Sequence, residues 1–330
     1  MSPKPKVLVT RELPPAVMES LHESFDLTVS PHDGPMPREE LLEALPGQDG
    51  LLPMLVDKID GELLDAAGGS LRMVANFAVG FNNIDLDAAT SRGIAVSNTP
   101  DVLTDSTADL ALALMLAVAR RVVEADVLTR PGRFPGWGPM FMLGADVHHK
   151  ILGIIGLGRI GQAVARRGLG FDMKVLYHQR TRLDPQQEKE LGVQFCKLDE
   201  LLAQSDFVSP HVPLTPETNR MIGQRELGLM KPGAFFINTA RGDVVDEAAL
   251  VRALESGAIA GAGLDVYENE PELHAGLLKL KNVVLLPHLG SATLDTRTNM
   301  GLVAAGNLRA LLLEGGKPPN CLNPQVLDRK

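Results

Sequence analysis

Residues 151–161 read ILGIIGLGRIG, with the pattern Gly156-x-Gly158-x-x-Gly161 at the end of an apolar run. The run predicts a buried strand, and the residues from Arg159 to Gly170 predict a helix that begins directly after the turn. In such a unit the first glycine permits a tight turn, the second lets a pyrophosphate approach the backbone, and the third allows helix and strand to pack closely. The helix N-terminus then faces the negative charge. The segment predicts a dinucleotide-binding α/β domain.

The strand expected next, Lys174 to Tyr177, bears on the choice of cofactor. In NAD-binding domains an acidic residue after this strand binds the ribose hydroxyls. Here the chain continues with HQRTR (178–182), which has two arginines and a threonine but no carboxylate. Because arginine can bind a phosphate through two hydrogen bonds, the segment predicts a preference for NADP(H), with NAD(H) also possible. The alternative is a solvated loop whose charges are incidental.

Outward from this motif, strand and helix patterns alternate along the chain. The strands expected before it are Lys6–Thr10, Phe25–Ser30, Gly50–Leu55, Leu71–Ala78 and Ile94–Ser97. A long helix is expected over Asp101–Thr129, a loop rich in proline and glycine over Arg130–Gly144, a second α/β series over Ile151–Leu286, and a final helix over Ala292–Leu313. Continuous apolar strands separated by helices indicate parallel sheets covered on both faces. We expect an α/β protein with two doubly wound parallel-sheet domains.

The composition excludes several classes of protein. The chain has 330 residues, 45% of them hydrophobic, and a formal net charge of −9, which disfavours binding to nucleic acid. Its two cysteines, Cys196 and Cys321, belong to no CxxC pair, as is usual in a reducing compartment. The longest apolar run, Leu110–Ala119, is too short to span a membrane, and the N-terminus lacks the apolar core of a signal peptide. We expect a cytoplasmic protein without a metal site or a membrane partner.

Three later segments each place a polar side chain directly after an apolar strand. They are FFINTARG (Phe235–Gly242), which contains Arg241; GLDVYENEP (Gly263–Pro271), which contains Glu270; and VVLLPHLGSAT (Val283–Thr293), which contains His288. Ligands of parallel sheets bind beyond the carboxyl ends of the strands. The three segments are therefore candidates for one catalytic site.

With further motifs, these segments make the chain resemble the D-isomer-specific 2-hydroxyacid dehydrogenase family over nearly its whole length. The added motifs are VGFNNID (Val79–Asp85), TDSTADLALALMLA (Thr104–Ala117) and HVPLTPET (His211–Thr218). Within the family the chain is most similar to the glyoxylate/hydroxypyruvate reductases. ADVHHK (Ala145–Lys150) and NCLNPQV (Asn320–Val326) resemble the branch that also reduces 2-ketogluconate.

The resemblance implies a catalytic set of Arg241, Glu270 and His288. Arg241 would bind the substrate carboxylate and polarise the adjacent ketone. His288 would act as general acid toward the carbonyl oxygen as hydride reaches C2, and Glu270 would orient the imidazole. The implied reaction is NADPH-preferring reduction of glyoxylate or hydroxypyruvate to glycolate or D-glycerate. A 2-keto-D-gluconate reductase is the alternative within the family, and a cofactor-sensing protein similar to the corepressors of this fold is the alternative of another class.

The resemblance and the motifs together give a set of binding residues. Those for the cofactor are Thr107, Gly156, Gly158, Arg159, Ile160, Gly161, Gln179, Arg180, Thr181, Arg182, Val212, Pro213, Thr239, Ala240, Arg241, Asp265, His288 and Gly290. Those for the substrate are Leu55, Val56, Val79, Gly80, Phe141, Arg241, His288 and Ser291. Asp265 would bind the nicotinamide carboxamide, and His211 is interpreted as lining the cofactor pocket rather than as a second base.

The family architecture implies a flavodoxin-like substrate domain, residues 1–100 plus 288–330, with a Rossmann domain, residues 101–287, inserted in it and the active site in the cleft. The long helix and the loop after it are the expected homodimer surface. In the reductases a tryptophan of this loop reaches the neighbouring subunit's active site. Phe141 occupies that position here, with Trp137 four residues earlier. A smaller ring there could admit a longer sugar acid.

Overall fold

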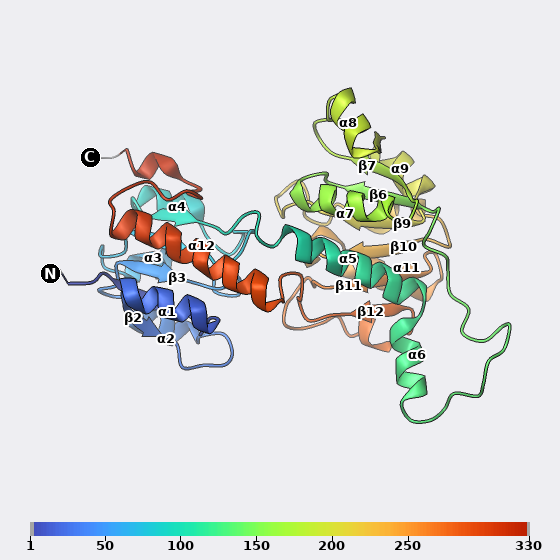
Figure 1. Ribbon diagram of the computed structural model, residues 1–330, viewed down its shortest axis with the longest axis horizontal. Coiled ribbons are helices and arrows are strands. Elements are labelled where there is room, and N and C mark those ends of the chain that lie inside the picture. The colour runs from blue at the N-terminus through green and yellow to red at the C-terminus, as the bar shows by residue number, and fades with distance from the viewer. Residues whose placement is uncertain (1–2, 329–330) are drawn as a thin grey trace. The chain divides into compact units, whose positions relative to one another are not determined.

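The computed structural model describes residues 3–328 and divides the chain into two compact units (Figure 1). The first unit comprises the residues up to Leu103 together with those from Ser291 onward, and the second comprises Thr104–Gly290. Each unit contains one parallel sheet with helices on both of its faces. The prediction of two doubly wound parallel-sheet α/β domains is confirmed.

The first unit has the strand order of a flavodoxin-like sheet. In spatial order the strands are β2 (Asp26–Val29), β1 (Lys6–Val9), β3 (Gly50–Leu52), β4 (Met73–Ala75) and β5 (Ala95–Ser97). The helices are α1 (Pro15–Ser24), α2 (Arg38–Ala44), α3 (Gly61–Ala66), α4 (Leu86–Ser91) and α12 (Leu294–Leu312), followed by the short 3-10 helix η3 (Pro324–Val326). The strands are shorter than the apolar runs that predicted them, because the residues beyond their carboxyl ends turn into loops.

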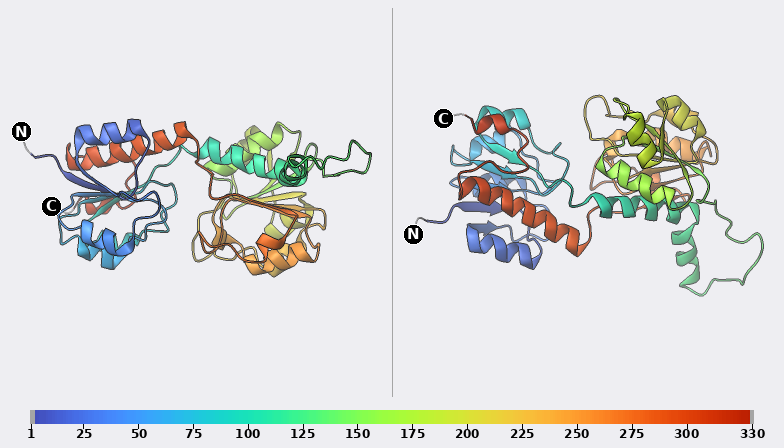
Figure 2. Two further views of the ribbon diagram at one scale, coloured as in Figure 1. Left: turned by 90° about the horizontal axis from the view of Figure 1, so that it is seen from below. Right: turned by 45° about the horizontal axis from the view of Figure 1, so that its top comes forward.

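The two faces of this sheet are covered by different helices (Figure 2). Helices α1 and α12 pack together on one face, and α2, α3 and α4 contribute apolar residues to the core on the other. Helix α12 lies close against α1, since a Cβ atom on Gly301 would be 2.5 Å from Cγ2 of Val17. The C-terminal part of the chain is thereby integral to the first unit.

The second unit has a seven-stranded sheet in the Rossmann order, with one additional strand at its edge. In spatial order the strands are β12 (Val283–Leu285), β11 (Gly261–Leu264), β10 (Phe235–Asn238), β9 (Phe207–Pro210), β6 (Ile151–Ile155), β7 (Lys174–His178) and β8 (Val193–Phe195). The helices are α5 (Thr104–Ala119), α6 (Val122–Thr129), α7 (Arg159–Leu169), α8 (Pro185–Leu191), α9 (Leu198–Gln204), α10 (Gln224–Leu229) and α11 (Glu247–Glu255), with 3-10 helices η1 (Gly242–Val244) and η2 (Leu277–Lys279).

The expected single helix over Asp101–Thr129 is wrong: it starts at Thr104 and breaks after Ala119. Arg121 has a left-handed backbone (φ +54°). The Ala119 carbonyl, which a continuous helix would offer to Val123, instead accepts the N–H of Ala145 at 2.8 Å. A tertiary contact therefore ends α5, and α6 turns away from it (Figure 1).

Pro210 lies in a central strand, where proline is rare because it has no N–H for the ladder. The adjacent Ser209 hydroxyl lies 3.3 Å from the Ile237 carbonyl of the neighbouring strand and donates to it. This side-chain bond satisfies a carbonyl of β10 beside the proline.

Within residues 3–328, no helix is long and apolar enough to cross a membrane.

Candidate active site

The glycine turn after β6 has the geometry of a phosphate-binding turn. Gly156 has φ +91°, and a Cβ atom on it would be 2.8 Å from the His211 carbonyl oxygen. A Cβ on Gly161 would be 2.2 Å from the Gly156 oxygen, whereas one on Gly158 would meet nothing within 4 Å. Helix α7 then starts at Arg159 and Ile160 with no side-chain cap. The turn is closed toward the protein and open at Gly158, as a bound pyrophosphate requires.

The loop after β7 lies beside this turn. Gln179 is the first residue after β7, and its side-chain oxygen accepts the N–H of Leu157 at 3.2 Å. The Gln179 amide nitrogen donates to the Thr181 carbonyl at 2.7 Å. Arg180 and Thr181 are exposed. Arg182 is also exposed on one side, but its guanidinium is bound to Glu188 through two hydrogen bonds.

Arg241 follows β10 in a turn that a neighbouring side chain holds in place. The side chain of the fully buried Asn238 accepts the N–H of Ala240 at 3.0 Å and donates to the Arg241 carbonyl at 2.9 Å. Arg241 is partly buried, and this burial lowers its pKa, while Glu270 acts in the opposite direction. Asn238 was not among the predicted residues, although it stands in the same NTARG motif.

Glu270 and His288 form the central pair of the site. Nδ1 of His288 lies 2.8 Å from one carboxylate oxygen of Glu270, and the other oxygen accepts the N–H of Tyr267 at 3.0 Å. Burial alone would raise the pKa of the Glu270 carboxyl. The hydrogen bond and the charge of His288 outweigh that effect, so the pKa lies below its ordinary value. Glu270 therefore remains a carboxylate and fixes one ring nitrogen of His288.

The loop that carries His288 is held by Asp265, which is 1% exposed. One Asp265 oxygen accepts the N–H of Leu289 at 2.6 Å, and the other accepts that of Gly290 at 2.8 Å. The His288 N–H donates to the Asp265 carbonyl at 2.9 Å. These three bonds hold His288 in a left-handed backbone conformation (φ +54°), which is strained for a residue other than glycine.

The turns that carry Arg241 and Glu270 are in direct backbone contact. A Cβ atom on Gly242 would lie 1.8 Å from the carbonyl carbon of Tyr267, so only glycine fits there. The buried carboxylate of Glu247, in the first turn of α11, accepts the N–H of Glu268 at 2.7 Å. Its burial raises its pKa. Glu247 thus supports the Glu270 turn from below and was not predicted from the sequence.

Other predicted cofactor residues lie around the same strand ends. Thr107, in α5, is buried and donates to the Gly290 carbonyl at 3.1 Å. Val212 packs over Gly156, and the Pro213 carbonyl accepts the hydroxyl of Thr218. The hydroxyl of Thr239 is buried and has no hydrogen-bond partner among the described residues. An orphaned hydroxyl beside Arg241 is what a site that receives a polar ligand would leave.

His211 lies at the end of β9, with Nε2 2.9 Å from the Ser209 hydroxyl. Burial lowers its pKa to about 4. The imidazole is therefore neutral near pH 7, and among the described residues it has no carboxylate partner such as His288 has. The His211 carbonyl lies beside Gly156, and the interpretation that His211 lines the cofactor pocket stays a prediction.

The predicted substrate residues of the first unit lie on two loops that share one polar network. Asn83 donates to the carbonyls of Met54 and Asp57 at 3.3 and 3.1 Å, and its amide pairs with that of Asn76 at 3.2 Å. Asn76 also donates to the Gly80 carbonyl at 2.9 Å. The network joins the loop of Leu55 and Val56 to that of Val79 and Gly80. None of the asparagines was predicted, although Asn83 is in the VGFNNID motif.

The Asp57 carboxylate completes this network. It accepts the N–H of Met54 at 2.7 Å and the Thr10 hydroxyl at 2.5 Å. Burial raises its pKa despite both bonds.

Ser291, another predicted substrate residue, is the first residue of the segment in which the chain re-enters the first unit.

Phe141 is not near the catalytic residues of its own chain. It lies on the loop between α6 and β6, and this loop is anchored at the end of α5, where Ala145 binds Ala119. The His288 loop is bound near the opposite end of α5, by Thr107. Phe141 is 37% exposed and contacts the ring of Phe134, with centroids 6.2 Å apart; Trp137 is 87% exposed.

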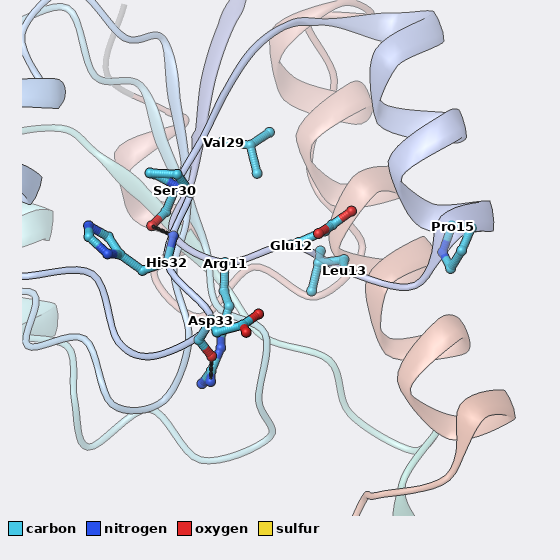
Figure 3. A pocket seen from close by; sticks show the side chains of 9 residues that line it. Arg11, Glu12, Leu13, Pro15, Val29, Ser30, His32 and Asp33 are labelled. Atoms are coloured by element: carbon cyan, nitrogen blue, oxygen red, sulfur yellow. Dashed lines mark hydrogen bonds between the residues drawn. The ribbon is translucent and has the colours of Figure 1, made fainter.

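A hollow of about 590 Å³ lies beyond the carboxyl ends of β1 and β2 in the first unit (Figure 3). Several of its polar groups already have partners. The Arg11 guanidinium donates to the Asp33 carbonyl, and the Ser30 hydroxyl accepts the N–H of His32 at 3.4 Å. His32 itself binds Glu40 at 2.7 Å. None of the predicted site residues lines this hollow, so it is not the candidate active site. Among the described residues no three His, Cys, Asp or Glu side chains are arranged to hold a metal.

Comparison with known proteins decides the family. Residues 112–290 match the model described as "D-isomer specific 2-hydroxyacid dehydrogenase, NAD binding domain". A glyoxylate reductase from Thermococcus gammatolerans is 52% identical over 331 residues, which cover 99% of this chain and 98% of that protein. The chain belongs to the D-isomer specific 2-hydroxyacid dehydrogenase family. The predicted resemblance is confirmed.

Solved structures of dehydrogenases of this family agree with the whole chain. A glyoxylate reductase from Paecilomyes thermophila has a TM-score of 0.87 and 38% identity, over 98% of this chain and 99% of that one. An NADPH-dependent glyoxylate/hydroxypyruvate reductase from Sinorhizobium meliloti, in complex with NADP and malonate, has a TM-score of 0.86 and 36% identity, over 97% of this chain and 98% of that one. As a member of this dehydrogenase family, the protein is an NAD(P)-dependent oxidoreductase acting on CH–OH groups.

Proposed function

We propose that the protein is an NADPH-preferring reductase of small 2-oxoacids, with glyoxylate and hydroxypyruvate as its substrates. The observation that carries the proposal is the pair Glu270–His288, 2.8 Å apart, in which the strained loop presents His288 to the Glu270 carboxylate next to the Arg241 turn. The relatives named as glyoxylate reductases, about half identical over the full chain, support the substrate class.

The residues present are suited to a nicotinamide dinucleotide. The open turn at Gly158 and the start of α7 would hold the pyrophosphate, and the buried Thr239 hydroxyl with Ala240 would lie beside the nicotinamide. When bound, the reduced cofactor supplies the hydride for C2 of the substrate. The protein's own contribution is to position the 2-oxoacid and to deliver the proton.

His288 is the proposed general acid. Because Nδ1 is bound to the Glu270 carboxylate, it carries a hydrogen, and Nε2 is the nitrogen left to give its proton to the substrate's carbonyl oxygen. The ionised Glu270 stabilises the imidazolium before the transfer and keeps the ring oriented. His288 would be neutral after the transfer and regain a proton from solvent.

Arg241 is the proposed anchor for the substrate carboxylate. Its fixed positive charge can make two hydrogen bonds to a carboxylate, and its partial burial strengthens them. In the first unit, the linked loops of Leu55–Val56 and Val79–Gly80 are proposed to offer backbone N–H groups to substrate. Val56 and Phe81 are exposed on these loops.

The proposed NADPH preference depends on Arg180. Within residues 3–328 it has no hydrogen-bonded partner, and Gln179 before it carries no charge that would repel a 2′-phosphate. The pKa of the exposed Glu217 carboxyl is lowered by a hydrogen bond from Thr215 and, more weakly, by the charge of Arg180. The Sinorhizobium meliloti relative, which is named as NADPH-dependent, supports this preference.

A homodimer is also proposed, through α6 and the loop that follows it. Helix α6 has no buried residue, and Val122, Val123 and Val127 are each about half exposed. The adjoining Trp137 and Met140 are 87% and 79% exposed. Large exposed apolar side chains gathered on one helix and the loop after it favour an interface. Light scattering after gel filtration should give twice the chain mass, and a monomer would refute the dimer.

Steady-state kinetics with glyoxylate, hydroxypyruvate and 2-ketogluconate, each with NADPH and with NADH, tests the function. We expect the highest kcat/KM for glyoxylate or hydroxypyruvate with NADPH. A clear preference for 2-ketogluconate would move the protein to the alternative branch, and a preference for NADH would refute the role of Arg180. Absence of turnover with all three acids, despite cofactor binding, would refute the reductase assignment.

A further inference from the structure

A compact cluster of side chains supports the loop proposed to bind the adenosine ribose. Arg182 donates to the two oxygens of Glu188 from Nε and Nη2, at 2.7 and 2.8 Å. The hydroxyl of Tyr177 donates to the same Glu188 carboxylate at 2.7 Å and accepts the N–H of Leu183 at 3.0 Å. Arg182 lies 5.4 Å from the ring centroid of Phe195. The cluster ties both ends of the segment 178–183 to helix α8.

The members of this cluster differ sharply in exposure. The side chain of Glu188 is only 11% exposed and Tyr177 is fully buried, whereas the Arg182 side chain is 56% exposed. A buried carboxylate needs its partners, because without them it would be an uncompensated charge. The hydrogen bonds from Arg182 and Tyr177 lower the pKa of Glu188 to about 2. Glu188 therefore holds Arg182 firmly.

We propose that Arg182 and Glu188 are positioning residues for cofactor recognition, and that they present Arg180 as the single arginine that binds the 2′-phosphate. The proposal rests on the proposed NADPH preference and corrects the expectation that both arginines serve the phosphate. Two of the guanidinium donors of Arg182 are used by Glu188, and the guanidinium carbon lies over the Phe195 ring. Arg180, two residues earlier, is exposed and has no hydrogen-bond partner among the described residues.

Gln179 connects this cluster to the phosphate turn. Its side chain joins the Leu157 N–H to the Thr181 carbonyl, so a displaced segment 178–183 would also displace the backbone next to Gly158. Loss of the Arg182–Glu188 pair should therefore weaken NADPH and NADH alike. Loss of Arg180 should weaken NADPH only.

The test measures dissociation constants of NADPH, NADH and 2′,5′-ADP for Arg182→Ala, Glu188→Ala and the double variant. If the pair positions the loop, both single variants weaken all three ligands about three- to tenfold, since a loop must then be ordered on binding, and the double variant is no worse than either. If instead Arg182 bound the phosphate in competition with Glu188, Arg182→Ala would weaken NADPH and Glu188→Ala would strengthen it. Effects of opposite sign would overturn the proposal.

Two further variants separate this proposal from its basis. Glu188→Gln keeps a hydrogen bond to Tyr177 and should weaken binding less than Glu188→Ala; equal losses would contradict the clamp. Arg180→Ala should weaken NADPH and 2′,5′-ADP about tenfold or more and leave NADH unchanged. If Arg180→Ala weakened both cofactors equally, the NADPH assignment would fail. The proposed positioning role of Arg182 and Glu188 would still be tested, because Arg182→Ala and Glu188→Ala should both weaken NADH. A lower melting temperature with unchanged dissociation constants would show a purely structural role and overturn it.

Discussion

Replacing Asp265 with asparagine tests whether the strained His288 loop depends on its carboxylate. The carboxylate accepts two backbone N–H groups, from Leu289 and Gly290, through different oxygens. Asparagine has one oxygen and one NH₂ group, so one bond is lost and a donor faces a donor. A hydrogen bond to a charged group contributes about 1.5–3 kcal/mol. Burial raises the pKa of Asp265, so removing its charge recovers part of this loss. We expect a net destabilisation of about 1–2 kcal/mol.

The larger effect should be on catalysis. His288 is held at φ +54°, a conformation that costs on the order of 1–3 kcal/mol and relaxes when its supports weaken. A shift of the imidazole by about 1 Å is enough to reduce turnover roughly 100-fold. The assay is kcat for hydroxypyruvate at saturating NADPH, together with the dissociation constant of NADPH and the midpoint of urea unfolding.

Thr107→Val is the matched control for this experiment. It removes a neutral hydrogen bond to the Gly290 carbonyl of the same loop, so it should lower kcat by less than tenfold. If Asp265→Asn reduced kcat less than twofold, the carboxylate would not hold the loop and the reasoning would fail. A rise confined to the NADPH dissociation constant would assign Asp265 to the nicotinamide carboxamide instead.

Three further outcomes are expected. Gly158→Ala should fold normally, because its Cβ meets no protein atom, but should lose NADPH affinity. Gly161→Ala should also unfold more readily, because its Cβ would be 2.2 Å from a carbonyl oxygen. Circular dichroism melts and cofactor titrations distinguish the two variants. His288→Gln should lower kcat about 10²–10⁴-fold with NADPH binding unchanged, and full turnover would exclude it as general acid. The pKa of Glu188 is lowered to about 2 in the folded protein, so its charge stabilises the fold above its unfolded pKa. The difference in unfolding free energy between wild type and Glu188→Gln should therefore shrink as pH falls from about 4.5 toward 2. Urea midpoints measured across that range would show a constant difference if the assignment were wrong.

Features encoded in short stretches of sequence were predictable. The glycine spacing at 156–161 placed a strand, a turn and a helix correctly, because each glycine meets a local steric demand. Continuous apolar runs separated by helical segments predicted both parallel sheets, since the strands of a sheet covered on both faces are apolar on both sides. Arg241, Glu270 and His288 were found as polar residues after apolar strands, and all three lie in the second unit.

Features that depend on distant partners were not predictable in this way. The break after Ala119 arises because Ala145, beyond a long loop, takes its carbonyl. Arg182 is bound by Glu188 from a different element, and the sequence around Arg182 gives no sign of that partner. Asn238, Asn83 and Glu247 act by binding backbone groups, and such roles leave no spacing pattern that distinguishes them from ordinary polar residues.

The contact at Gly242 limits how this enzyme can change its substrates. Because the turns of Arg241 and Glu270 meet backbone to backbone, any side chain at position 242 would force apart the two turns that carry the proposed anion anchor and the proposed partner of the proton donor. A laboratory selection for new acids should therefore leave the 2-oxoacid head of the substrate unchanged. Variation should accumulate on the part of the pocket that faces the substrate's tail, where replacing one residue does not force two main chains apart.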